Sequence, residues 1–233
     1  MAGKQLRLNL SVAVPALNEE AALKSAVEDL LHELRPEVES LDIIVVDDGS
    51  TDRTGEIADA LAAQHTEVRV LHHEANRGIG AAYRAALAAA KGDYFVDFRG
   101  DHENAAAEIA QTVRHARPGA MVTTHHLSSD PRPWFRKLIS RTYTGLLCVL
   151  FRRKVGYFNG LTLYPTGVLR EFPPVSDGFL YSAETLIRAL RRGLELVELE
   201  YPLRRRETGS SSALRMSSIR QALRDIRRMV THE

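Results

Sequence analysis

Two acidic loops, each directly after an apolar run, carry the strongest chemical signal in the sequence. They read VPALNEE (Val14–Glu20) and VVDDGSTDRT (Val45–Thr54). An aspartate such as Asp47 can accept a hydrogen bond from the N–H of a nucleotide base, and a turn glycine lets backbone approach a ligand. The alternative is purely structural, with residues 47–50 forming a turn that feeds a helix cap. Both interpretations place these segments in loops.

Two later segments extend this pattern. Asn76–Tyr94 reads NRGIGAAYRAALAAAKGDY and sets a glycine pair before a run with helical spacing. Gly92–Ile109 reads GDYFVDFRGDHENAAAEI and surrounds one arginine, Arg99, with acidic residues. A glycine pair is weak evidence alone. The order and spacing of the four segments together indicate a ligand site.

The segments that must position these loops alternate between strand and helix. Short β-branched runs predict strands at Leu8–Val14, Ile43–Val46, Val68–Leu71, Tyr94–Phe98 and Met121–Thr124. Helical spacing predicts helices at Glu19–Leu34, Arg53–Ala63, Gly80–Lys91 and Ala105–His115, with Asp52 and Asn104 as N-caps. This succession predicts an α/β fold with a mostly parallel sheet and helices on both faces. Ligands bind beyond the carboxyl ends of such strands, which selects the loops after strands one, two and four.

The second half of the chain is less regular and more basic. Pro131-Arg132-Pro133 marks a boundary, after which Trp134–Phe151 predicts a helix that is apolar almost all round. Residues 1–130 carry 12 Lys/Arg against 21 Asp/Glu, and the remainder carries 19 against 9. We therefore divide one domain into an acidic first half (1–130) and a basic second half (131–212). Residues 213–233 predict a basic amphipathic helix.

Composition sets the class of protein. The chain has 233 residues, 44% hydrophobic and 26% charged, which is typical of a globular protein. The single cysteine, Cys148, excludes an internal disulfide and favours a reducing compartment. With neither a signal-peptide pattern nor a membrane-spanning run, we expect a cytoplasmic protein. Its histidines His65, His72 and His73 lack a metal-ligand spacing, so we expect them at the surface.

The basic half suits an anionic partner such as phosphate or an acidic membrane surface. The apolar helix 134–151 has two interpretations, part of the core or a surface against a membrane. A peripheral position at the inner face of the membrane agrees with the second. A nucleic-acid partner is not expected, because few aromatics are interleaved with the basic residues for stacking.

The four segments, in this order, resemble glycosyltransferase family 2, whose GT-A fold is Rossmann-like. The resemblance covers about residues 8–212. It implies a nucleoside-diphosphate sugar as the donor, with Asp47 bonding the base. It also implies that residues 1–130 are the nucleotide-sugar-binding half and residues 131–212 the acceptor-binding half. The residues that it assigns to nucleotide binding are Pro15, Leu17, Glu19, Asp47, Asp48, Gly49, Asn76, Gly78 and Gly100.

The fourth segment departs from the family. Its Asp-x-Asp motif aligns with Arg99 at the first aspartate and Asp101 at the second, while Glu103 takes the place of a Gln and Asp97 falls two residues early, within the strand. Asp101 and Glu103 can hold Mg²⁺ or Mn²⁺ through oxygen ligands. Alternatively, the planar fork of Arg99 bonds the phosphates directly. Either source of charge stabilises a leaving diphosphate. The third alternative is a degenerate site without catalysis.

The second half resembles the polyprenyl-phosphate sugar synthase branch of the family. The resemblance implies phosphate or acceptor contacts from Arg136 and Ser140, and from Arg206 and Ser211 in a closing loop. His125 stands where the branch carries an arginine. This departure, with Tyr157 and Ser212 at two further branch positions, leaves a small polar acceptor as an alternative.

Glu184 occupies the position of a catalytic base in other family members. A base is needed for a neutral hydroxyl or amine acceptor but not for a phosphate, which is already anionic. The alternative is a helix glutamate paired with Arg188 one turn later. We therefore predict an inverting transferase with Asp101, Glu184 and Arg99 as catalytic residues. Polyprenyl phosphate is the first choice of acceptor, and the alternatives are a soluble small molecule or a non-catalytic nucleotide-sugar-binding protein.

Overall fold

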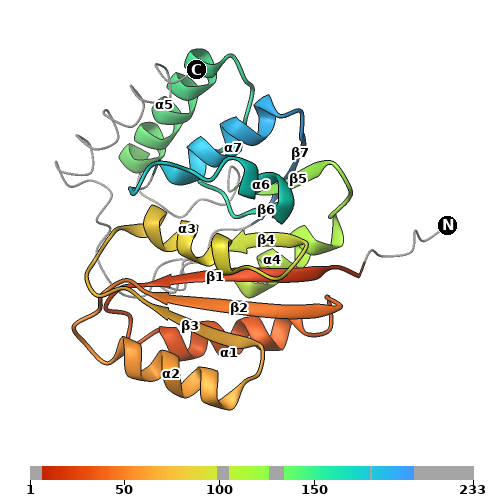
Figure 1. Cartoon of the computed structure of the whole chain (residues 1–233). Coiled ribbons are helices and arrows are strands. Elements are labelled where there is room, and N and C mark those ends of the chain that lie inside the picture. The colour runs from red at the N-terminus through yellow and green to blue at the C-terminus, as the bar shows by residue number, and fades with distance from the viewer. Residues whose placement is uncertain (1–6, 99–104, 126–133, 179, 202–233) are drawn as a thin grey trace.

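The order of the strands separates the two halves of the chain within one sheet. The computed structural model describes residues 7–98, 105–125, 134–178 and 180–201 (Figure 1). Within these ranges seven strands form a sheet in the order β3-β2-β1-β4-β6-β5-β7. Their bounds are β1 Asn9–Ala16, β2 Ser40–Asp47, β3 Val68–His72, β4 Tyr94–Asp97, β5 Ala120–His125, β6 Thr162–Pro165 and β7 Glu195–Glu200. Because one sheet spans both predicted halves, they form a single domain.

Strand directions confirm the mostly parallel sheet. β1 pairs in parallel with β2 and with β4, β2 pairs in parallel with β3, and β5 pairs in parallel with β7. β6 runs antiparallel to both of its neighbours, β4 and β5. The five predicted strands are all present, and no end differs from its prediction by more than three residues. Strands β6 and β7 were not predicted.

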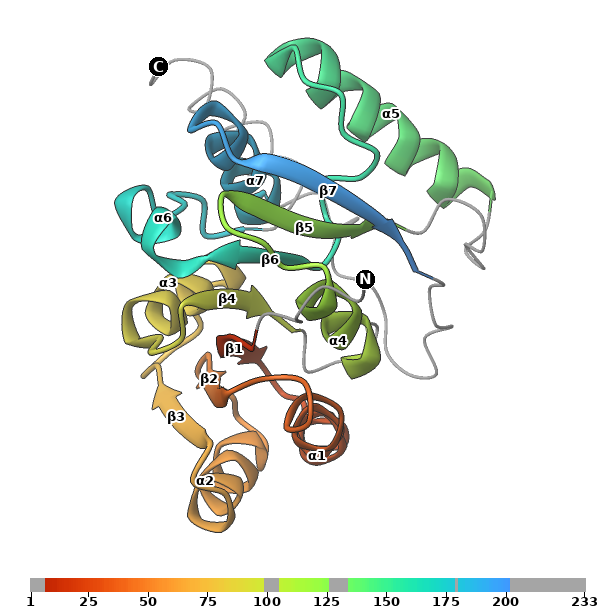
Figure 2. The ribbon, with the colours of Figure 1, turned by 90° about the vertical axis from the view of Figure 1, so that its right-hand side faces the viewer.

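Seven helices lie in the described ranges, and the four predicted in the first half are all present. The bounds are α1 Leu23–Leu34, α2 Thr54–Gln64, α3 Ile79–Ala89, α4 Ala106–Arg114, α5 Trp134–Phe151, α6 Thr166–Glu171 and α7 Tyr181–Arg191. Viewed along the sheet, α1, α2 and α4 lie on one side and α3, α6 and α7 on the other (Figure 2). The two-faced arrangement predicted from the sequence is thus confirmed.

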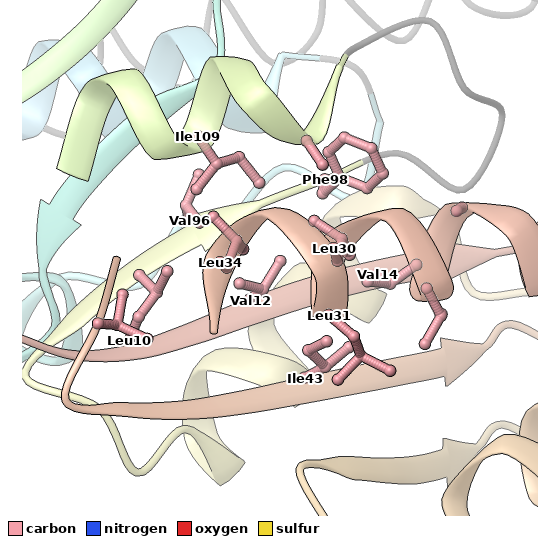
Figure 3. Packing of buried hydrophobic residues seen from close by; sticks show 14 of the residues in the cluster. Leu10, Val12, Val14, Leu30, Leu31, Leu34, Ile43, Val96, Phe98 and Ile109 are labelled. Carbon is pink, nitrogen blue, oxygen red and sulfur yellow. The ribbon is translucent and has the colours of Figure 1, made fainter. Parts of the chain in front are cut away.

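Alternation along the central strands explains these two layers. Val12 and Val14 of β1 point into one buried cluster, whereas Ala13 between them belongs to the other. Figure 3 shows the first cluster, in which Leu30 and Leu34 of α1 pack over the sheet. Side chains of α4 join the same cluster. Burial on both faces favours β-branched runs in the central strands, as the sequence shows.

Two predicted helix starts need correction. α1 begins at Leu23 rather than Glu19, because residues 17–22 form a loop whose backbone bonds to the next loop. The N-cap position of α2 is Arg53, one residue after the predicted Asp52. The Asp52 carboxylate nevertheless accepts the capping bond from Thr54 N–H, at 3.0 Å. Asn104 lies outside the described residues.

Helix α5 matches its prediction end for end, but only one of its faces packs on the domain. Leu147 and Phe151 are buried in the second cluster. The opposite face exposes large apolar side chains, namely Leu138, Ile139, Leu146, Val149 and Leu150. None of the helices in the described ranges is both long and apolar enough to cross a bilayer. The boundary at residues 131–133 and the predicted helix of 213–233 fall outside the described residues.

Candidate functional site

Strand register brings the predicted nucleotide loops to one edge of the sheet. Ala16 at the end of β1 pairs with Asp47 at the end of β2, and Ala13 pairs with Asp97 at the end of β4. Because the three strands are parallel, their carboxyl ends lie side by side. The Asp48 N–H donates to the Ala16 carbonyl at 2.9 Å, which extends the pairing into the loops.

Asp47 is the last residue of β2 at this edge and is only 7% exposed. Its Oδ1 accepts a hydrogen bond from Ser50 N–H at 3.0 Å, which closes the turn. Its Oδ2 lies 3.1 Å from Nδ1 of His72, the residue that pairs with Asp47 across β2 and β3. Burial by itself raises the pKa of Asp47, but the bonds from Ser50 and His72 bring it below its ordinary value. Asp47 is therefore a carboxylate at neutral pH.

Asp48 ties the second loop to the third. Its side chain is buried, and it accepts bonds from Arg77 N–H at 3.0 Å and Gly78 N–H at 2.9 Å. His73 Nδ1 lies 2.6 Å from its Oδ1. The predicted surface position of His73 is wrong, because its side chain is only 8% exposed. Asp48 therefore holds residues 73–78 in place. Any effect of Asp48 on a ligand is indirect, through the position of this loop.

Glycines at this edge allow close packing between loops. Gly49 has a φ of +76°, and a Cβ there would lie 2.5 Å from the Ala75 carbonyl carbon. Gly78 has a φ of +93°, and its Cβ would lie 2.5 Å from the Asp177 carbonyl oxygen. An L side chain would be strained at both positions. Both glycines are thus required for close contact between protein loops. This requirement is separate from the predicted approach of backbone to a nucleotide.

The loop after β1 is fastened to the loop after β2. Asn18, at a φ of +56°, donates its N–H to Ser50 Oγ at 3.0 Å and accepts from Thr51 N–H at 2.9 Å. Glu19 N–H donates to Thr54 Oγ1 at 2.8 Å. Pro15 is half-buried, and Leu17 is exposed at the same edge. The exposed Asn76 accepts from Gly78 N–H at 3.0 Å.

A loop of the second half, residues 173–178, contacts the beginning of α3. Gly80 N–H donates to the Asp177 carbonyl at 3.0 Å, and Arg84 of α3 pairs with the Asp177 carboxylate. Arg84 also donates to the Ser176 carbonyl at 3.2 Å. This contact was not predicted from the sequence. It connects the predicted nucleotide loops to the acceptor half.

Glu184 of α7 anchors this same loop. Its carboxylate is 2% exposed and accepts from Val175 N–H at 3.0 Å and Ser176 N–H at 2.9 Å. Arg188 lies 2.7 Å from its Oε1, which confirms the predicted pair one turn apart. A catalytic base must reach the proton that it removes. The enclosed carboxylate therefore favours the structural interpretation of Glu184 over the catalytic one.

Asp97 was missed as a site residue. The predicted position of Asp97 within a strand is confirmed, although β4 ends at Asp97 and does not continue to Phe98. Tyr181 OH donates to its Oδ2 at 2.5 Å. Nearby Tyr83 is fully buried, and burial raises its pKa well above the ordinary value. Knowing that β4 ends at Asp97 would have pointed to this residue, but the spacing of the sequence did not define that strand end.

The predicted diphosphate residues Arg99, Gly100, Asp101 and Glu103 lie outside the described residues, as do Arg206 and Ser211. Within the described ranges, no three His, Cys, Asp or Glu side chains gather in a metal-binding group. Asp97 supplies one carboxylate at this edge, which is fewer than the ligands that Mg²⁺ or Mn²⁺ needs. Any metal therefore needs ligands from outside the described residues or from the donor.

The predicted acceptor residues lie on the other side of β4. His125 ends β5, which β6 separates from β4. Its Nδ1 is buried and has no hydrogen-bond partner among the described residues. Arg136 and Ser140 belong to α5, where Ser140 is half-buried. The fold does not bring this group together with Asp47, because β1, β4 and β6 stand between β2 and β5.

Comparison with known proteins identifies relatives over most of the chain. A family model described as Glycosyl transferase family 2 matches residues 11–174. A polyprenol monophosphomannose synthase from Mycolicibacterium smegmatis is 30% identical over 227 residues, covering 91% of this chain and 83% of that protein. The glycosyltransferase AglD from Haloferax volcanii is 30% identical over 204 residues, covering 82% of this chain. The chain spans only 32% to 44% of the length of AglD and two other curated relatives.

Solved structures share the fold. Glucosyl-3-phosphoglycerate synthase from Mycobacterium tuberculosis in complex with UDP superposes with a TM-score of 0.72 at 23% identity, covering 96% of this chain and 80% of that one. The same enzyme with Mn²⁺, UDP and phosphoglyceric acid gives a TM-score of 0.71 at 24% identity, covering 94% and 78%. At this identity the likeness shows the GT-A fold alone.

Proposed function

Because the chain belongs to glycosyltransferase family 2, we propose that it is an inverting transferase with a nucleoside-diphosphate sugar as donor and polyprenyl phosphate as acceptor. The observation that carries the donor assignment is the edge where β1, β2 and β4 end, with ionised Asp47 at the end of β2. An ionised carboxylate there accepts bonds from a base N–H. Pro15, Leu17, Glu19, Asn76 and Gly78 surround the nucleoside, and Asp48 and Gly49 shape their loops.

The diphosphate binds beyond β4, where two sources of positive charge compete. In our first choice Asp101 and Glu103 hold Mg²⁺ or Mn²⁺, with affinity weakened by Arg99, and Asp97 supports them from the strand end. The cation supplies charge that stabilises the leaving diphosphate. In the alternative, Arg99 binds the phosphates without a metal. The acceptor oxygen attacks the anomeric carbon opposite the diphosphate, and the phosphate-binding residues hold that group as it leaves.

Two observations support a phosphate acceptor. Glu184 has its carboxylate bound to Val175, Ser176 and Arg188, and an anionic acceptor needs no base. The relative from Mycolicibacterium smegmatis is a polyprenol monophosphomannose synthase that is aligned over 91% of this chain. We place Arg136, Ser140 and His125 on the acceptor side, with Arg206 and Ser211 closing over the phosphates. A soluble hydroxyl acceptor is the second candidate, favoured by histidine at position 125.

A lipid acceptor requires a membrane surface, and α5 fits one. Five large apolar side chains are exposed on its outer face, with Val149 78% exposed. Exposed cations lie on and directly after this helix, with Arg141 within it and Arg152, Arg153 and Lys154 following its end. Apolar side chains between cations are suited to the headgroup region of an anionic bilayer. We propose that this face of α5 lies against the membrane that holds the acceptor.

The acceptor is tested with a radiolabelled panel of nucleoside-diphosphate sugars in the presence of undecaprenyl phosphate vesicles. Label that moves into the organic phase supports the lipid acceptor. Label that stays wholly in water, although donor is consumed, overturns it and favours the soluble candidate. Absence of both transfer and donor hydrolysis, with nucleotide binding retained, supports the non-catalytic alternative.

The metal is tested in the same assay with EDTA. Loss of activity, restored by Mn²⁺ or Mg²⁺, supports a cation on Asp101 and Glu103. Activity that EDTA leaves unchanged supports Arg99 as the source of charge, and Arg99→Asp should then make transfer depend on added metal. Failure of that variant to gain metal dependence contradicts the arginine alternative.

A further inference from the structure

His72 joins two acidic side chains that come from different elements. Its Nδ1 lies 3.1 Å from Asp47 Oδ2 on β2, and its Nε2 lies 3.0 Å from Asp59 Oδ1 on α2. Gly55 of α2 lets the helix approach closely, since a Cβ there would lie 2.9 Å from Asp47 Oδ2. The imidazole, whose side chain is 45% exposed, therefore links β3 to both β2 and α2 next to Asp47.

Both contacts can be hydrogen bonds only when the imidazole is protonated. An ionised carboxylate accepts but does not donate, and a neutral imidazole has a single N–H. Neutral His72 could donate to Asp47 or to Asp59, but not to both. The geometry therefore assigns an imidazolium to this position, with one positive charge between two negative ones.

We propose that His72 is a positioning residue for the nucleotide: as an imidazolium anchored on Asp59, it holds the Asp47 carboxylate in the orientation that receives the base. This rests on the proposed role of Asp47 in nucleotide binding. Asp47 keeps its bond from Ser50 when His72 is neutral, but its Oδ2 is then fixed only if Asp59 gives up its own bond. Loss of the proton thus loosens the carboxylate without removing it.

The direction of the pH dependence follows from the same contacts. Asp59 and then Asp47 raise the pKa of His72 above its ordinary value, against the opposing effect of partial burial. These two carboxylates, from α2 and β2, are the charged groups that act on the imidazole within the described part of the chain. Nucleotide affinity should be full below the ordinary histidine pKa and should fall as pH rises through the raised one.

Asp59→Asn tests the proposal without touching Asp47 or the nucleotide. The asparagine removes the charge, so the pKa of His72 should fall toward its ordinary value. Its amide can also turn to accept from protonated His72 or donate to neutral His72, which leaves the Nδ1–H on Asp47 in both states. Affinity for nucleoside diphosphates should match the wild type at pH 5.5 and should no longer fall at high pH, where the wild type should become about three- to tenfold weaker, the usual net effect of losing one hydrogen bond. Glu56→Gln, on the same helix and paired with Arg53, is the matched control and should leave the profile unchanged.

Two readouts keep the outcomes apart. NMR titration gives the pKa of His72, whose signal is assigned by its absence in His72→Gln, and calorimetry with UDP, GDP, CDP and dTDP gives affinity from pH 5.5 to 9. His72→Gln should abolish the pH dependence of binding. An Asp59→Asn profile that coincides with the wild type, despite a lowered His72 pKa, overturns the positioning role. A wild type that binds none of the four nucleotides, with the His72 titration as expected, overturns the proposed function instead.

Discussion

The two ends of the sheet use their polar groups differently. At the ends of β1 and β2, the loops after the strands bond to each other, as Asn18, Glu19 and Asp48 show. At the end of β5, His125 keeps a buried nitrogen without a partner among the described residues, and the nearby α5 turns apolar side chains to solvent. The polar groups of the loops after β1 and β2 are bonded within the protein. The region of β5 and α5 instead presents groups that suit a partner.

This difference fits the two substrates that we propose. A nucleotide site whose loops are already held in place loses little conformational freedom on binding. An acceptor that lies in a bilayer is reached only when the protein binds the membrane. The acceptor side of the protein can therefore expose apolar side chains until it binds there. We therefore expect substitutions in the first region to change stability, and those on the outer face of α5 to change association.

The largest effect is expected from Gly49→Ala. The substitution forces an L residue into a φ of +76° and places a Cβ 2.5 Å from backbone of residue 75. We expect the free energy of unfolding to fall by about 3 kcal/mol, from backbone strain plus overpacking. Gly119→Ala has a similar φ of +75° but nothing within 4 Å, so its cost should be about 1 kcal/mol. Urea denaturation measures both changes in the free energy of unfolding. Equal changes would contradict close packing of Gly49 against residue 75.

Glu184→Gln tests whether the loop of residues 173–178, which connects the two halves, also depends on internal bonds for stability. Loss of the buried charge facing Arg188 and two backbone N–H groups should cost about 2 kcal/mol of unfolding free energy. Glu171→Gln, in an exposed pair with Arg192, should cost about 0.5 kcal/mol or less. If Glu184 is instead a base, the turnover number falls by orders of magnitude while stability is kept. Thermal unfolding and single-turnover rates, measured together, separate these outcomes.

The smallest effect on the fold is expected on α5. Val149→Glu changes a side chain that is 78% exposed, so the melting temperature should stay unchanged. Binding to vesicles of anionic lipid should weaken about tenfold, through lost apolar contact and added repulsion. Ala60→Glu places the same charge at an exposed position on α2 and should bind like the wild type. Cosedimentation with vesicles measures the binding. Equal binding by both variants would contradict the proposal that α5 contacts the membrane.

Local patterns predicted most of the fold. The helix at Trp134–Phe151 and the first five strands follow from apolar runs and helical spacing, which depend on neighbouring residues alone. Strand β6 was missed because four residues of TLYP carry little periodic signal. Its place between β4 and β5 is a property of the whole sheet. Local sequence does not contain that information.

The site was predicted unevenly for the same reason. Asp47 and Gly49 belong to a motif that can be recognised within ten residues. His72 depends on the pairing of Asp47 with His72 across β2 and β3, so the sequence suggested only a surface histidine. Glu184 was assigned two possible roles, and only the position of residues 175–176 shows what its carboxylate contacts. Partners distant in sequence are thus what the prediction lacked.

The antiparallel strand β6 has a consequence for how the chain folds during synthesis. Strands β1 to β4 form a parallel unit from contiguous sequence, so this unit can fold while the rest is still being translated. One edge of β4 then stays unpaired until β6 is made, after α4, β5 and α5. An unpaired edge can pair with other chains. Chains truncated before residue 162 should therefore aggregate, which light scattering would detect.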